Sequence, residues 1–321
     1  MAKDTSLAPS EKRALLASVA LLYYGDGLTQ SDIAQRMQLS RATIVNLLRE
    51  ARDQGVVEIR IDGAALTGSS LGQALRAAYG LRDVYLADIR DGGADSPAAA
   101  LRRLGQVGGI AVTEIVRPGD RVGVAWGATI KAVAEAMPRR AVTDVAVYQM
   151  IGSMASGAIP PSETCAIDIA NRLDARAFTL HAPALASSAE MAQRMRAEPT
   201  IRAQVDALNG LDMVVASLGD MGPETRLLQA GIVTEAELEA ARSAGAVGVL
   251  CGRFIDSSGA VLRIAPDARL IAADLDVVRR AARRVLVVGG AHNAAAVRAA
   301  IAGGFVSHLC VDAALARALL G

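Results

Sequence analysis

The chain has 321 residues, which is long for one typical domain and suits two. Hydrophobic residues make up 52% of it and charged residues 21%, a balance that supports large cores and excludes a wholly disordered chain. The net charge of +1 excludes a protein that binds nucleic acid through bulk charge alone.

Residues 1–62 carry the pattern of a winged helix-turn-helix. Thr29 is an N-cap with Asp32 as its capping-box partner, Ser40 caps the next helix, and Gly55 ends it. Gln38 and Leu39 are expected to make the turn between the two helices, with Leu39 pointing inward. This order places the capped second helix of the motif in the major groove of DNA. The three helices and the wing strand are predicted over residues 10–24, 30–37, 41–54 and 56–61.

Polar side chains of this head are the candidates for contact with DNA. Arg can bond guanine, and Asn adenine, through two hydrogen bonds, so we expect Arg41 and Asn46 to read bases. Arg49 and Arg52 lie further along the helix and suit phosphates. An amphipathic helical hairpin inside a core is the alternative. The candidate DNA-binding residues are Thr29, Gln30, Ser40, Arg41, Thr43, Asn46, Arg49 and Arg52.

The head is electrically neutral. In residues 1–62, two Lys and six Arg balance five Asp and three Glu. A neutral head gains little from nonspecific attraction to phosphates. We therefore expect two or more heads to act together in a homo-oligomer.

The three cysteines are far apart and show no metal-ligand spacing. Cys165, Cys251 and Cys310 are therefore expected to be reduced thiols of a cytoplasmic protein. No metal and no cofactor is expected. No apolar run is long enough to span a membrane, so a membrane partner is not expected either.

Beyond a predicted linker at residues 63–70, residues 71–321 alternate short apolar runs with helical stretches. This alternation predicts a doubly wound, mostly parallel α/β sheet. Strands are predicted at Val84–Ala87, Arg121–Val124, Val145–Met150, Ala177–Leu180, Met213–Ser217, Ala246–Leu250, Leu270–Ala272, Val285–Val288 and Leu309–Val311. Helices are predicted at Leu71–Tyr79, Ala98–Val116, Thr129–Met137, Ser162–Leu173, Ala189–Met195, Ile201–Leu208, Glu235–Ala244, Ala294–Ala302 and Ala313–Leu320.

Three strand-to-helix turns could bind a ligand, because ligands of such sheets bind outside the carboxyl ends of the strands. Two are glycine turns whose backbone N–H groups could bind phosphate or sugar oxygens, and the third ends in a carboxylate. Each turn could also be purely structural. Their candidate residues are Trp126, Gly127, Ala128 and Thr129, then Gly289, Gly290, His292 and Asn293, and then Asp312.

Motifs of catalysis are scarce. The sequence contains no P-loop, no Gly-x-Ser-x-Gly, no metal cluster and no Gly-x-Gly-x-x-Gly after a strand. The three histidines, at 181, 292 and 308, have no catalytic spacing. The pocket turns therefore lack the acids and bases that an enzyme positions.

The chain resembles, over nearly its whole length, the SorC family of bacterial sugar-responsive transcription regulators, also called DeoR-like. The motifs that carry this resemblance are specific for the family when taken together, although each one alone is weak. They include Leu28-Thr29-Gln30, Leu39-Ser40-Arg41 and Gly55-Val56-Val57 in the head, then Pro118-Gly119-Asp120, Gly123 to Thr129, Gly252-Arg253-Phe254-Ile255-Asp256, Gly289-Gly290 and Asp312.

The resemblance implies an effector domain similar to sugar-phosphate isomerases but without catalysis, and homodimers or homotetramers whose DNA binding changes with a sugar-like effector. Gly127, Ala128 and Thr129 would hold oxygens of the effector, and Gly152, Ser153 and Glu163 would close the pocket. This chain departs from the family in having Asn293 where a Lys is common and Val249 where an acid is common. Because a phosphate partner is lost, an unphosphorylated sugar, polyol or sugar acid becomes an option.

We therefore expect a regulator of a carbohydrate operon with double-stranded operator DNA and a small sugar, polyol or sugar phosphate as partners. The alternatives are a sugar-phosphate isomerase-like enzyme with an accessory DNA-binding head, and a DNA-binding scaffold that ignores effectors.

Overall fold

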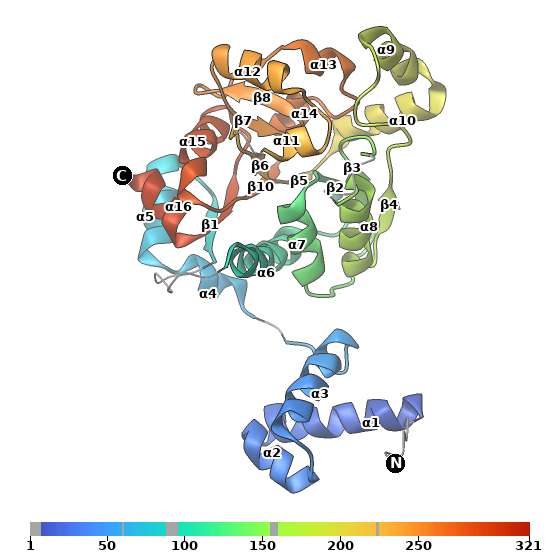
Figure 1. The fold of residues 1–321 in the computed structure, drawn as a ribbon, viewed down its shortest axis with the longest axis vertical. Coiled ribbons are helices and arrows are strands. Elements are labelled where there is room, and N and C mark those ends of the chain that lie inside the picture. Colours follow the sequence, from blue (N-terminus) through green and yellow to red (C-terminus); the bar gives the residue numbers. More distant parts are fainter. Residues whose placement is uncertain (1–7, 60, 88–95, 155–159, 223–224) are drawn as a thin grey trace. The chain divides into compact units, whose positions relative to one another are not determined.

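A computed structural model describes residues 8–59, 61–87, 96–154, 160–222 and 225–321 (Figure 1). The chain divides into two compact units, Met1–Ile61 and Asp62–Gly321. Each unit is built around its own apolar clusters.

The first unit is helical. Leu16, Val19, Ile33, Ile44 and Ala51 are fully buried at its centre, at the helical spacing expected of amphipathic helices. Its elements are α1 (Pro9–Ala20), a π-helical turn η1 (Leu21–Gly25), α2 (Gln30–Met37) and α3 (Arg41–Asp53).

The caps that define the helix-turn-helix are confirmed. The Thr29 hydroxyl accepts the N–H of Asp32, and the Asp32 carboxylate accepts the N–H of Thr29. The Ser40 hydroxyl accepts the N–H of Thr43 at 3.0 Å. Gln38 takes the left-handed conformation, with φ of 54°, and turns the chain between α2 and α3.

Two details of the head were predicted wrongly. Leu39 was expected to point inward, but it is an exposed turn residue. The wing is missing, because no strand forms at 56–59 or 61, the described part of the predicted strand. Val56 and Val57 instead both donate their N–H groups to the Ala51 carbonyl at the end of α3.

The segment that we predicted as a linker begins the second unit as a capped helix, α4 (Gly63–Thr67). The Asp62 carboxylate accepts the N–H of Ala64, and Gly63 donates its N–H to the Glu114 carboxylate at 2.7 Å. A Cβ at Gly63 would lie 2.1 Å from a Glu114 oxygen. The small residue Gly63 therefore serves close packing within the segment that we predicted as a linker.

The second unit is organised around a seven-stranded parallel sheet in the order β1-β11-β10-β5-β2-β3-β4. Successive residues of its strands face opposite sides. Val214 and Leu286 pack in one apolar cluster, and Met213, Val215 and Val285 in the other. Both faces are therefore covered, as predicted. The strands are β1 (Asp83–Leu86), β2 (Arg121–Val124), β3 (Ala146–Gln149), β4 (Arg176–Phe178), β5 (Met213–Ala216), β10 (Arg283–Val287) and β11 (His308–Val311).

The helices around the sheet agree closely with the sequence pattern where they are long. The described helices are α5 (Ser70–Tyr79), α6 (Pro97–Ile115), α7 (Ala128–Ala136), α8 (Ser162–Leu173), α9 (Ala189–Ala197), α10 (Pro199–Ala207), α11 (Arg226–Gln229), α12 (Glu235–Ser243), α13 (Ala265–Arg269), α14 (Leu275–Arg280), α15 (Ala294–Ala302) and α16 (Ala313–Leu320), with short 3-10 turns η2 (Leu208–Gly210) and η3 (Ala291–Asn293).

The order of the strands reverses between β2 and β5. From β2 the chain continues to β3 and β4 on one side, and from β5 it continues to β10 and β11 on the other. The loops that follow β2 and β5 therefore leave toward opposite sides of the sheet. A crevice at such a reversal point is the usual ligand site of an open α/β sheet.

The prediction for Ala246–Leu250 needs a correction. This strand, β7, forms a separate antiparallel sheet, β6-β7-β8-β9, with β6 (Leu218–Gly219), β8 (Arg253–Asp256) and β9 (Val261–Leu262). Cys251 and Gly252, both with positive φ, make the tight turn between β7 and β8. The predicted strand at Leu270–Ala272 makes only two isolated bridges, to Leu185 and Ile151.

Candidate functional site

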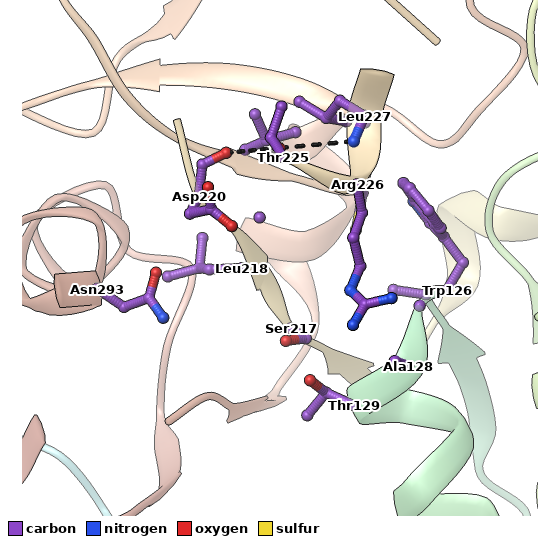
Figure 2. Close-up of a pocket in the computed structure, with 16 residues that line it drawn as sticks. Trp126, Ala128, Thr129, Ser217, Leu218, Asp220, Thr225, Arg226, Leu227 and Asn293 are labelled. Carbon is purple, nitrogen blue, oxygen red and sulfur yellow. Dashed lines mark hydrogen bonds between the residues drawn. The ribbon is translucent and has the colours of Figure 1, made fainter. Parts of the chain in front are cut away.

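A cavity of about 180 Å³ lies at the reversal point of the sheet (Figure 2). It is smaller than the 300–1,000 Å³ typical of sites for drug-sized ligands, so it suits a small metabolite. Its lining residues are Ala125, Trp126, Gly127, Ala128, Thr129, Ser217, Leu218, Gly219, Asp220, Thr225, Arg226, Leu227, Val249, Cys251, Gly252 and Asn293.

The turn after β2 forms one wall. Gly127 has φ of 112° and precedes α7. A Cβ at Gly127 would meet nothing within 4 Å, so this side of the backbone faces open space. The start of α7 presents backbone N–H groups that no turn of the helix uses, and Thr129 adds a hydroxyl. The predicted residues Trp126, Gly127, Ala128 and Thr129 thus all line the cavity.

The segment after β6 supplies two charged side chains. One carboxylate oxygen of Asp220 accepts the N–H of Gly222 at 2.7 Å. The backbone carbonyl of Asp220 accepts the Thr225 hydroxyl at 2.8 Å. Thr225 also caps α11, whose first residue is Arg226. Figure 2 shows the Arg226 side chain extending from α11 past Trp126 toward Ser217 and Thr129. Its guanidinium has no hydrogen bond or ion pair with any described residue.

Asn293 reaches the cavity from the turn after β10. Its Nδ2 donates to the Gly289 carbonyl at 2.7 Å and lies 3.2 Å from Nε2 of the His292 ring. The side chain is buried, and Figure 2 shows its amide directed toward the side of the cavity where Asp220 lies.

Cys251 lines the cavity as an inert thiol. It is fully enclosed in the tight turn between β7 and β8, and burial raises its pKa to about 12. The thiol is therefore neutral at physiological pH and is unsuited to nucleophilic attack.

The remaining predicted effector residues do not line the cavity. Asp312 caps α16 by accepting the N–H of Leu315, and it also accepts the N–H of Gly290 at 2.6 Å. His292 is exposed, and Gly289 is held by the Asn293 amide. These residues fix the turn from which Asn293 extends.

The loop after β3 has a packing role. A Cβ at Gly152 would lie 2.4 Å from the Pro183 carbonyl, and Ser153 donates its N–H to Ala182 at 2.8 Å. Ser162, buried at the start of α8, donates to the Gly152 carbonyl at 2.9 Å, with Glu163 beside it. Gly152, Ser153 and Glu163 therefore lie outside the cavity lining.

Sequence reasoning missed Ser217, Asp220, Thr225 and Arg226. None of them lies in a glycine turn that joins a predicted strand to a predicted helix. Ser217 follows β5 directly, and the rule that ligands bind at strand ends could have identified it.

In the head, α3 presents a polar surface. Arg41 and Arg52 are exposed, and their guanidinium groups bond no other described residue. Arg49 donates to the side-chain oxygen of Asn46, so this pair must open before Asn46 can bond adenine with both amide atoms. Of the other predicted contacts, Thr29, Ser40 and Thr43 take part in helix caps, and Gln30 is half-buried at the start of α2.

Residues 65–321, most of the chain, match the family model described as "Putative sugar-binding domain". The chain is 33% identical over 301 residues to the transcriptional regulator YjhU of Escherichia coli (strain K12), covering 93% of this chain and 92% of that protein. The chain belongs to the sugar-binding domain family of SorC-like regulators.

Two further likenesses extend over the full length of this SorC-like protein. The deoxyribonucleoside regulator of Bacillus subtilis (strain 168) is 28% identical over 313 residues, or 97% of this chain and 98% of the relative. The full-length sorbitol operon regulator SorC of Klebsiella pneumoniae shares the fold, with a TM-score of 0.71 at 23% identity, covering 97% of this chain and all of that one.

These relatives confirm the prediction of a transcription regulator of a sugar-related operon over that of an isomerase-like enzyme. No helix in the described residues is both long and apolar enough to cross a bilayer. In the same residues, no group of three His, Cys, Asp or Glu side chains could hold a metal ion.

Proposed function

We propose that this SorC-like regulator binds its operator through α3 and changes its affinity when a small sugar, polyol or sugar phosphate occupies the cavity between β2 and β5. The observation that carries the proposal is the cavity itself, which combines an open glycine turn with an Arg226 guanidinium that pairs with none of the described residues. As a transcription regulator, the protein would act in the cytoplasm as a homodimer or homotetramer.

The lining has the composition of a carbohydrate site. Ser217 and Thr129 offer hydroxyl groups, Asp220 and Asn293 offer oxygen acceptors, and Trp126 adds a large apolar surface. These groups match the alternating hydroxyls and C–H faces of a sugar.

The described lining of the cavity lacks the pair of acid and base residues that catalysis on such a ligand would need. Among the described lining residues, Asp220 is the one carboxylate, and there is no His or Lys. Proton transfer to and from a sugar carbon requires positioned groups of matched pKa. The lining therefore supports binding of a ligand without its conversion.

Two arginines of α3 test the DNA-binding half of the proposal. If Arg41 reads a base, Arg41→Ala should weaken binding to the cognate operator by about 1–3 kcal/mol and relax its sequence preference. Arg52→Ala should weaken operator and random DNA alike and lower the slope of log affinity against log salt by about one. Fluorescence anisotropy with both DNAs at several salt concentrations measures each effect.

Arg194→Ala on α9, an exposed residue of the second unit, is the control and should leave both affinities unchanged. Equal losses on operator and random DNA in the Arg41 variant would make Arg41 a phosphate contact. Wild-type affinity in both α3 variants would rule out α3 as the DNA-binding helix.

A further inference from the structure

We infer that the effector is a polyhydroxy carboxylic acid of monosaccharide size, a sugar acid, whose carboxylate binds Arg226 and whose hydroxyl groups bind Asp220 and Asn293. The inference rests on the proposed function, because it specifies the ligand of the same cavity.

The charges of the lining favour a monoanion. Among the described residues of the cavity, Arg226 is the one cation and Asp220 the one anion. The N-terminus of α7 contributes about half a positive charge. Over the described lining the sum is slightly positive, which suits the single negative charge of a carboxylate better than a phosphate monoester, which carries about −1.5 to −2 at pH 7.

Arg226 is suited to a carboxylate. Its guanidinium is unpaired within the described chain and extends into the cavity (Figure 2). The planar fork of Arg matches the two oxygens of a carboxylate through paired hydrogen bonds. Because Asp220 bonds Gly222 and not Arg226, the guanidinium remains available for a ligand.

The acceptors lie on the other side of the view in Figure 2, where Asp220 and Asn293 are drawn. Nδ2 of Asn293 is occupied by the Gly289 carbonyl and the His292 ring, which leaves its oxygen without a bond from a described residue. One oxygen of Asp220 is likewise left over after the bond to Gly222. Bare acceptors bind hydroxyl donors and repel anionic oxygens.

Position 293 reinforces the distinction from phosphates. An ammonium group there would offer a second cation opposite Arg226, but Asn293 offers an oxygen. The cavity therefore has a donor end for one acid group and an acceptor end for several hydroxyls. A volume of about 180 Å³ limits the ligand to about the size of one sugar.

The test uses the full-length protein and a matched panel. The probes are the aldonates of the five- and six-carbon aldoses, the alditol and aldose of each configuration, and the corresponding aldose phosphates. Thermal shift identifies binders and isothermal calorimetry gives their Kd. We expect at least one aldonate to bind tenfold or more tightly than its matched alditol and its matched phosphate.

Three variants follow. Arg226→Gln should weaken the aldonate at least tenfold while changing the alditol less than threefold. Arg194→Gln, which removes an exposed arginine of α9, should leave both unchanged. Asn293→Lys should reverse the preference toward the phosphate. Circular dichroism and the Tm without ligand show whether each variant is folded.

The inference is overturned if a phosphate or alditol binds wild-type protein more tightly than every aldonate, if no aldonate binds, or if Arg226→Gln leaves aldonate affinity intact. Failure of the proposed function has a different signature: no compound of any class then binds or alters operator affinity. A phosphate or alditol that binds and shifts operator affinity would refute the sugar acid alone.

Discussion

Gly127 combines a strained conformation with an open position. Its φ of 112° disfavours any side chain, and a Cβ there would project into unfilled space at the cavity. We predict that Gly127→Val weakens effector binding at least tenfold and costs about 1–3 kcal/mol of stability through backbone strain. DNA binding by the unliganded variant should survive. Calorimetry and thermal unfolding measure the two effects.

Gly119 provides the matched control. It too has positive φ, 80°, and open space around its missing Cβ, but it lies in the turn before β2 and outside the cavity lining. Gly119→Val should therefore cost similar stability and leave effector affinity unchanged. Equal loss of effector binding in both variants would show that strain, and not obstruction of the cavity, is responsible.

At the scale of single residues, local sequence pattern located one wall of the cavity, Trp126 to Thr129, and Asn293. Gly127 and Thr129 were predictable because a strand, a glycine turn and a helix follow one another in the sequence. Arg226 was not, because only the tertiary course of the chain brings α11 to the cavity. The cavity therefore has a cation, Arg226, although position 293 is Asn and not Lys.

At the scale of elements, the strands of the parallel sheet were predictable because buried strands read as continuous apolar runs between helices. The small antiparallel sheet was not: β6 and β9 have two residues each, too few for any periodicity. The prediction of the wing strand was wrong for a different reason. An alternating segment becomes a strand only with a partner, and the amides of Val56 and Val57 bond the end of α3.

The packing of α6 on α7 yields an element-scale prediction. A Cβ at Gly105 would lie 2.6 Å from the Ala132 carbonyl of α7, so only glycine allows this approach. We predict that Gly105→Ala destabilises the second unit by about 1–3 kcal/mol. Because α7 begins at the cavity wall, effector affinity should fall as well. Denaturant unfolding and calorimetry test both effects.

Gly68, at the end of α4, is the comparison for that variant. It has φ of −77°, and the nearest atom to its missing Cβ is 3.8 Å away. Gly68→Ala should therefore be neutral within about 0.5 kcal/mol. An equally neutral Gly105→Ala would mean that α6 and α7 separate without cost.

At the scale of the whole molecule, the neutral head predicts dependence on assembly. Residues 1–61 have their own buried cluster and caps, so they should fold alone. With eight positive and eight negative side chains in residues 1–62, one head should bind DNA weakly. We expect residues 1–62 to bind the operator at least 100-fold more weakly than the full chain, because linked heads gain effective concentration. Equal affinities would refute this dependence.

The most direct test of effector-controlled DNA binding is the operator Kd of the full-length protein, by fluorescence anisotropy, with and without saturating effector. The operator is selected from genomic DNA by binding, and the effector is the compound that raises the Tm most. Allosteric coupling of typical size predicts a change in Kd of about 5- to 150-fold, in either direction. The same change should be absent in Gly127→Val. An operator Kd that stays the same with the cavity saturated would contradict the account.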